Sequence, residues 1–125
     1  MAELVPLYEG RLATIYAVAG SLGEASFAES FLLSRPLDAL KKLRKAIGRL
    51  GDCGPPRNPE KCRPIKSESN LYELKEKPNR LMYFRLGRDF VLTHGFEKHS
   101  GPPLRVEIER AKRLRAAVMA RNGDH

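Results

Sequence analysis

Three segments within residues 71–98 carry the hydrophobic and polar pattern of consecutive β-strands. Each is rich in β-branched, aromatic and aliphatic residues, and the two breaks between them contain Pro, Asn and Gly. The segments are 71–75, 79–85 and 89–98. Because each segment has the length of a strand and each break supplies turn residues, the pattern predicts an antiparallel meander.

The middle segment has apolar side chains on both of its faces. Strand alternation gives two sets: Arg80, Met82, Phe84 and Leu86 on one face, and Leu81, Tyr83 and Arg85 on the other. A strand of this kind lies inside its sheet, so we expect helices on one side of the sheet and a concave surface on the other. Arg80 and Arg85 are then expected to emerge at the borders of the sheet.

Two helices are predicted before the meander. Ser21 and Glu24 have the spacing of a capping box, and a short helix with an apolar stripe follows them. Pro36 suits the first turn of a second helix, which Gly51 is expected to end. Its apolar positions repeat every three to four residues: Leu37, Leu40, Leu43, Ile47 and Leu50. Packed as a hairpin, the two helices should cover one face of the sheet.

The other segments complete a single α+β domain over residues 1–125. Leu12 to Ala19 predicts an edge strand within an N-terminal extension, residues 1–20. The four prolines of residues 51–70 predict a loop. An apolar stripe from Leu104 to Val118 predicts a C-terminal helix, with residues 122–125 frayed. We expect a sheet of four to five strands, antiparallel except at a mixed edge.

Positive charge dominates the composition. The chain has 23 Lys and Arg against 15 Asp and Glu, a formal net charge of +8. This excess favours anionic partners such as nucleic acid or an acidic protein, and a basic protein without such a partner is the alternative. One face of the second predicted helix is basic, and this face either is exposed to solvent or contacts RNA. It carries Lys41, Lys42, Arg44, Lys45 and Arg49.

Several classes of protein do not fit the sequence. Cys53 and Cys62 are too widely spaced for a thioredoxin-like motif and too few for a zinc site, so free thiols are expected. No apolar run approaches the roughly 20 residues of a membrane-spanning helix. No signal peptide is visible, which predicts a cytoplasmic protein without a membrane partner. We expect neither a metal nor another cofactor.

Basic residues and histidines gather near the ends of the predicted strands. RNA can be cut without a metal because its 2′-hydroxyl attacks the adjacent phosphate, provided that the protein supplies a base, an acid and cations. Arginine fits phosphate with two parallel hydrogen bonds, and histidine transfers protons near neutral pH. We therefore interpret Arg80 and Lys98 as transition-state cations and His99 as the proton-transfer group.

Further residues are candidates of lower rank. His94 is a second proton-transfer candidate, although its alternation with Phe90 and Leu92 favours a hydrogen-bonded core or rim histidine. Other residues are candidates for positioning RNA: Lys75, Arg85, Tyr83, Lys61 and Lys66. Tyr83 is more often a core aromatic, and the two lysines of the loop are equally consistent with plain surface residues.

The order of these motifs resembles the phage Gp49-like and HigB branch of the RelE/ParE toxin superfamily. The motifs are Leu71-Tyr72-Glu73-Leu74-Lys75, Asn79-Arg80-Leu81-Met82-Tyr83 and His94-Gly95-Phe96-Glu97-Lys98. The resemblance implies a RelE-like fold with a short strand near residues 63–66. Arg80 matches the arginine of the family's Arg-x-x-Tyr strand, and Lys98 matches its first basic residue after the Gly-Phe turn.

The resemblance also implies a function. Members are toxins of two-gene toxin–antitoxin modules, commonly endoribonucleases that cut mRNA in the ribosomal A site, and their antitoxins often carry a helix-turn-helix. This chain departs from the pattern at Glu73, where the ribonucleases carry a catalytic lysine, and at His99, where a second lysine is usual. The alternatives are a non-catalytic toxin, as in relatives that poison DNA gyrase, and a phage-derived nucleic-acid-binding domain without toxicity.

Overall fold

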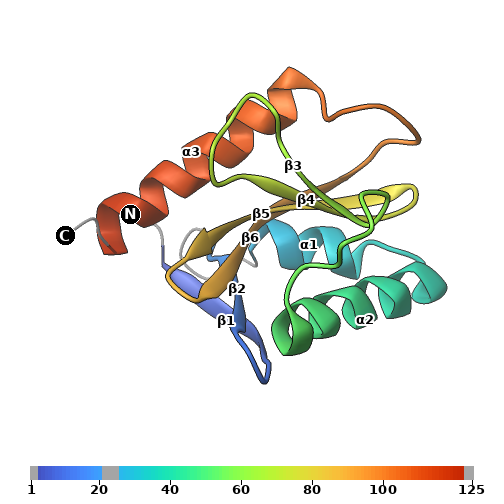
Figure 1. Cartoon of the computed structure of the whole chain (residues 1–125), viewed down its shortest axis with the longest axis horizontal. Coiled ribbons are helices and arrows are strands. Elements are labelled where there is room, and N and C mark those ends of the chain that lie inside the picture. Colours follow the sequence, from blue (N-terminus) through green and yellow to red (C-terminus); the bar gives the residue numbers. More distant parts are fainter. Residues whose placement is uncertain (1–2, 21–25, 123–125) are drawn as a thin grey trace.

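One mixed sheet organises the protein. The structure, a computed structural model, describes residues 3–20 and 26–122, and within these ranges the sheet has six strands (Figure 1). They are β1 (Leu4–Glu9), β2 (Thr14–Val18), β3 (Cys62–Pro64), β4 (Tyr72–Glu76), β5 (Asn79–Leu86) and β6 (Asp89–Glu97). Their spatial order is β1-β2-β6-β5-β4-β3, and only the β2–β6 pair is parallel.

The predicted meander is confirmed as β4, β5 and β6, and the predicted strand at its edge is β2. The prediction of four to five strands is wrong, because β1 adds a sixth strand outside β2. This strand contains Pro6, which an edge strand tolerates, since one side of it donates no hydrogen bonds to a neighbour. The short strand that the family resemblance implied is present as β3.

Helices cover both faces of the sheet. The described part of the chain has α1 (Phe27–Leu33) and α2 (Leu37–Cys53) on one face and α3 (Arg105–Asn122) on the other (Figure 1). Ser26 caps α1 in a capping box with Glu29, whereas the predicted capping pair Ser21 and Glu24 lies outside the described residues. The face that was expected to be concave is therefore covered by α3 along part of its length.

The N-terminal hairpin is fastened to the end of α2. The Tyr8 hydroxyl donates to Asp52 at 2.8 Å, and the backbone amides of Leu12 and Ala13 both donate to the carbonyl of Gly51 at 2.9 Å. A Cβ on Gly51 would lie 2.8 Å from the Tyr8 ring. Gly51 thus permits the Tyr8 ring to pack closely against α2. The helix continues to Cys53, so the prediction that Gly51 ends it is wrong.

The predicted alternation of β5 is confirmed. Leu81 and Tyr83 lie in the core beneath α1 and α2, and Met82 and Phe84 lie on the side of α3. The pairing of β5 with β6 contains a bulge, because Met82 pairs with His94 while Tyr83 pairs with Leu92. The extra residue reverses the alternation of β6 beyond Leu92.

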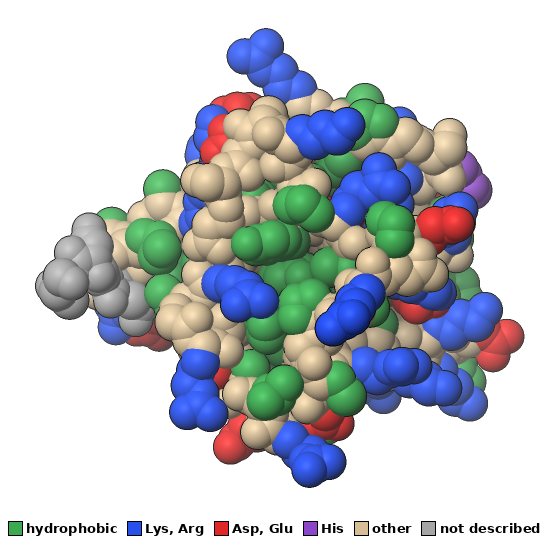
Figure 2. Space-filling model, in the orientation of Figure 1, with side chains coloured by type: hydrophobic (Ala, Val, Ile, Leu, Met, Phe, Trp, Pro, Cys, Tyr) green, Lys and Arg blue, Asp and Glu red, His purple; other side chains and the backbone are tan. Residues whose placement is uncertain are grey.

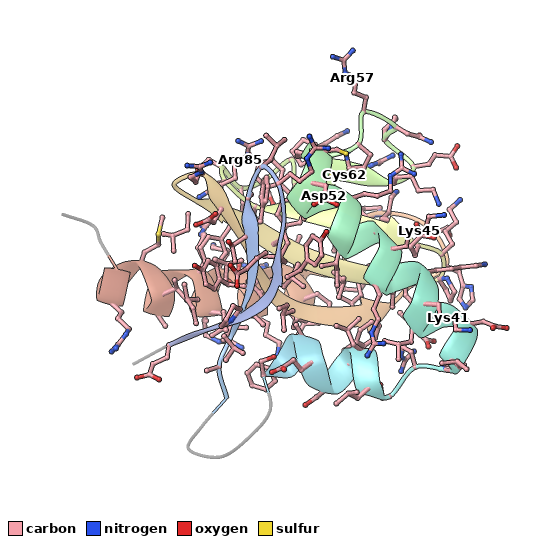
Figure 3. All side chains as sticks on the ribbon, turned by 90° about the horizontal axis from the view of Figure 1, so that it is seen from below. Lys41, Lys45, Asp52, Arg57, Cys62 and Arg85 are labelled. Carbon is pink, nitrogen blue, oxygen red and sulfur yellow. The ribbon has the colours of Figure 1, made fainter. Side chains whose placement is uncertain are left out.

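Basic side chains are prominent on the surface. In the view of Figure 2, apolar side chains occupy a depression in one side of the molecule, and Lys and Arg side chains surround it. Lys41 and Lys45 project from α2, and Arg57 projects from the loop between α2 and β3 (Figure 3). Exposed basic side chains therefore lie on several elements of the protein.

Candidate functional site

Arg80 lies inside the protein, at the end of β5 and on the face that α3 covers. Its side chain is buried, with 2% of the residue exposed. Nη1 donates to Glu73 Oε2 at 2.9 Å and to the carbonyl oxygen of Gly101 at 2.6 Å. The prediction that Arg80 emerges at the border of the sheet is therefore wrong. Removing a guanidinium from water is costly unless a counter-charge is present, and Glu73 supplies it.

Strand register explains this ion pair. Lys75 is the direct cross-strand partner of Arg80, and Glu73 pairs with Met82, so Glu73 is a diagonal neighbour of Arg80 on the same face. Two cations placed directly opposite repel each other, and the Glu73 carboxylate beside them offsets that repulsion. Glu73 Oε1 is buried without a hydrogen-bond partner among the described residues.

The loop after β6 carries Lys98 and His99 to the same end of the sheet. The Lys98 amide donates to the carbonyl of Pro78 at 2.9 Å, and Gly101 takes a φ of +82°. The Lys98 ammonium lies 3.9 Å from the position that a Cβ would occupy on Gly101. His99 is exposed. Arg80 binds the carbonyl of Gly101, so it fastens the loop that presents Lys98 and His99.

Lys75 is a buried cation of this region. It is largely buried, with 8% of the residue exposed. Burial lowers its pKa below the ordinary lysine value, the positive charge of Arg63 lowers it further, and Glu73 partly opposes both effects. A lysine with a lowered pKa gives up its proton more readily at neutral pH, which suits proton transfer.

His94 is a buried bridge between β6 and α3. Nδ1 lies 3.1 Å from Thr93 Oγ1, and Nε2 lies 3.0 Å from Glu107 Oε1 on α3. Only 1% of the residue is exposed, and burial lowers its pKa, with Glu107 acting in the opposite direction. The bulge in β6 turns His94 toward α3, although simple alternation with Leu92 would have turned it toward α1 and α2.

These motif residues lie within a segment that matches a known family. A family model described as phage derived protein Gp49-like (DUF891) matches residues 30–116. The chain belongs to this family. The recognition made from the three strand motifs is confirmed, because this is the RelE/HigB-type toxin family. Membership implies a toxin of the toxin–antitoxin kind and an antitoxin partner. A search of the curated proteins found no match to the chain.

The Gp49-like match covers most of the protein but not its N-terminal hairpin. It begins within α1, continues through α2 and β3 to β6, and ends within α3. Strands β1 and β2 lie outside it. The cations of β4, β5 and the β6–α3 loop therefore belong to the shared part of the fold. No helix of the described residues is long and apolar enough to cross a membrane.

The other predicted RNA-positioning residues of this Gp49-like protein have different surroundings, and of these Lys61 lies beside Lys75, whose amide donates to the Lys61 carbonyl at 2.8 Å. Tyr83 is fully buried, its hydroxyl lies 3.1 Å from Cys62 Sγ, and burial raises its pKa, so the prediction of an RNA contact there is wrong. Arg85 is exposed, but it stacks on the Phe90 ring on the opposite face from Arg80. Lys61 and Lys66 are exposed.

Sequence reasoning ranked two other residues too low. Arg63 on β3 acts on Lys75 electrostatically, and no motif marked it. Glu73 was treated as a departure from the family pattern, but it is the counter-charge of Arg80. The pairing of Glu73 with Arg80 could have been predicted from the sequence. A tight hairpin with a two-residue turn at Lys77-Pro78 places Glu73 diagonally to Arg80.

Proposed function

We propose that this protein is the toxin of a two-gene module and that it inhibits translation by cutting mRNA on the ribosome. The observation that carries the proposal is the loop held at Gly101 by Arg80, which presents Lys98 and exposed His99 at one end of the sheet. The antitoxin is expected to be a helix-turn-helix protein encoded by the adjacent reading frame. Membership in a toxin family supports this role.

The reaction requires no group beyond those of the chain and its RNA. The 2′-hydroxyl attacks the adjacent phosphate while a base takes its proton, and an acid donates a proton to the departing 5′-oxygen. In this proposal His99 is a proton-transfer group, Lys98 stabilises the charge that develops on the phosphate, and Lys75 is a second group that can bind or release a proton.

Arg80 has a different role from the one expected of it. Its charge is offset by Glu73, and two of its hydrogen bonds are used inside the protein. Arg80 therefore acts as a positioning residue that holds the 98–101 loop, and not as a direct phosphate ligand. A substitution at Arg80 is expected to weaken toxicity and stability together, whereas one at Lys98 should affect toxicity alone.

Controlled expression in a bacterial host tests the proposal. The intact protein should arrest growth and produce new mRNA 5′ ends that lie in frame, and Lys98→Ala should abolish both. Arg113→Ala, which removes an exposed cation from α3, is the matched control and should keep full toxicity. Arrested growth with intact transcripts, or unchanged cleavage in Lys98→Ala, would contradict the assignment.

One observation favours a second candidate function. Because Arg80 pairs with Glu73, it is not available as the phosphate-binding cation that was expected. This is consistent with a toxin that does not cut RNA. Such a toxin could act on DNA gyrase. Inhibition of supercoiling by the purified protein, with normal transcripts in cells that express it, would select this alternative.

A further inference from the structure

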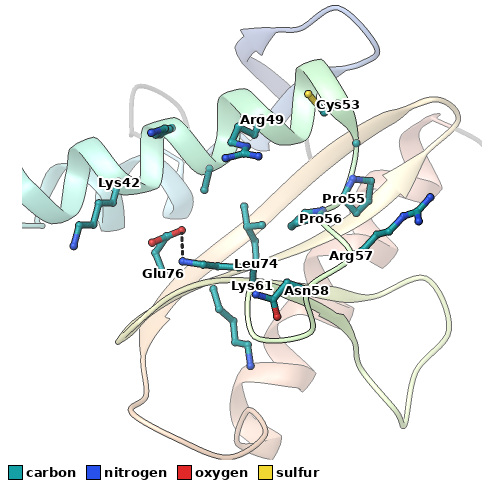
Figure 4. Close-up of a pocket in the computed structure, with 14 residues that line it drawn as sticks. Lys42, Arg49, Cys53, Pro55, Pro56, Arg57, Asn58, Lys61, Leu74 and Glu76 are labelled. Carbon is teal, nitrogen blue, oxygen red and sulfur yellow. Dashed lines mark hydrogen bonds and ion pairs between the residues drawn. The ribbon is translucent and has the colours of Figure 1, made fainter.

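We propose that a cationic hollow between α2 and β4, on the opposite face of the sheet from Arg80, binds single-stranded RNA. The hollow has a volume of about 710 Å³ and is shown in Figure 4. It is bordered by α2, the loop of residues 53–58, Lys61 and the end of β4. This volume falls within the range of about 300–1,000 Å³ that is usual for ligand sites. The proposal does not depend on RNA cleavage.

Cations line two sides of the hollow. Lys42, Lys45 and Arg49 form one stripe of α2, because they are three and four residues apart. The stripe extends for about 10 Å along the helix axis. Arg57, Lys61 and the buried Lys75 of β4 line the other side. In Figure 4 the side chains of Lys42 and Arg49 extend from α2 toward β4.

Most of this charge is not offset by the protein. Glu76 is the one acidic residue among those lining the hollow, and it pairs with Lys61 at 3.2 Å. Within residues 3–20 and 26–122, Lys42, Lys45, Arg49 and Arg57 form neither ion pairs nor side-chain hydrogen bonds. Their mutual repulsion makes the hollow attractive to a ligand with several negative charges.

Part of the lining of the hollow is apolar. It consists of Ala46, Pro55, Pro56 and the buried Leu74. Apolar surface of this kind can contact the face of an unpaired base, while Arg49 and Arg57 hold phosphates through paired hydrogen bonds. A polynucleotide strand supplies both chemistries in every unit, whereas an acidic peptide supplies charge but not a flat base. These features favour single-stranded RNA.

A binding measurement with an uncleavable probe tests the site directly. The probe is a fluorescein-labelled 2′-O-methyl decanucleotide, which lacks the attacking hydroxyl, and its affinity is followed by fluorescence anisotropy across a salt series. Arg49→Glu/Arg57→Glu should weaken binding roughly tenfold or more. A plot of the logarithm of the binding constant against the logarithm of the salt concentration should also become less steep. Its slope should change by about 0.7 for each phosphate contact that is lost.

The control is Lys41→Glu/Arg113→Glu, which makes the same change in net charge at exposed positions outside the hollow. It should retain most of the affinity. Equal losses in the two double variants would overturn the site, because the effect would then belong to the net charge alone. Circular dichroism of both variants shows whether each is folded.

Cys53 gives a second measurement that needs no substitution. Cys53 is exposed and lines the hollow. Cys62 is buried, and burial raises the pKa of the Cys62 thiol. The decanucleotide should slow alkylation of Cys53 by iodoacetamide and leave Cys62 unchanged. Protection by a deca-glutamate peptide but not by RNA would overturn the proposal in favour of an acidic protein partner.

Discussion

Two cationic regions of this protein differ in how their charge is balanced. On the face that α3 covers, Arg80 is buried and pairs with Glu73. In the hollow beside α2, Arg49 and Arg57 are exposed and have no acidic partner within the described residues. A buried charge requires a partner, whereas water stabilises an exposed one.

The difference separates two uses of a basic side chain. Arg80 is committed to the fold, because its hydrogen bonds go to Glu73 and Gly101. The exposed cations of the hollow remain available to an anionic ligand. The number of positive charges in a region is thus a poor guide to its binding capacity, and the pairing of each charge is a better one.

The largest expected effect comes from removing the buried counter-charge. Glu73→Ala leaves the Arg80 guanidinium buried and unpaired, so the free energy of unfolding should fall by about 3–5 kcal/mol. Urea denaturation measures this loss. Glu60→Ala is the control, because it removes only an exposed ion pair with Lys77 and should change stability little.

A double variant sharpens the same test. Glu73→Leu/Arg80→Met replaces both charges with apolar groups, and it should recover most of the stability lost in Glu73→Ala. If the double variant were as unstable as the single one, the loss would come from packing and not from an unpaired charge. The toxicity of the double variant should still be reduced, because Gly101 loses the donor that fastens its loop.

A smaller effect is expected from His94 as the pH changes. Burial lowers its pKa in the folded protein below the ordinary value of 6.5. Between these two pKa values the unfolded chain binds more protons, so the free energy of unfolding decreases as the pH falls below about 6.5. His94→Gln should remove up to about 1.4 kcal/mol per pH unit from this dependence.

Urea denaturation at pH 7, 6 and 5 measures the difference between His94→Gln and the parent protein. His99→Gln is the matched control, because His99 is exposed. The difference from the parent should be larger for His94→Gln than for the same substitution at His99. A steeper pH dependence in His94→Gln would show that the bridge to Glu107 raises the pKa of His94 more than burial lowers it.

The smallest effect is expected at the rim of the hollow. Lys61→Ala removes the partly exposed ion pair with Glu76, and the free energy of unfolding should change by less than about 1 kcal/mol. RNA affinity should decrease only modestly, because Lys61 already has an acidic partner. A loss of affinity as large as that of Arg49→Glu/Arg57→Glu would contradict the distinction between paired and unpaired cations.

Local patterns in the sequence predicted most of the elements. The meander, α2 and α3 follow from alternation, helical periodicity and turn residues, all of which act over short stretches of chain. Strand β1 was not predicted, and its role depends on pairing with β2 at the edge of the sheet. The preference for His94 as a hydrogen-bonded core histidine is confirmed, but the face of the sheet on which it lies depends on a bulge, and so on how β5 pairs with β6.

The sequence by itself determined the family, the excess of positive charge and the order of strands in the meander. Only the tertiary structure decided which of those charges are available. Arg80 and Glu73 meet because strand register places them diagonally on a face that is also buried, and the hollow exists because a proline-containing loop lies opposite α2. Pairing and burial depend on contacts between distant segments, and no local pattern specifies those contacts.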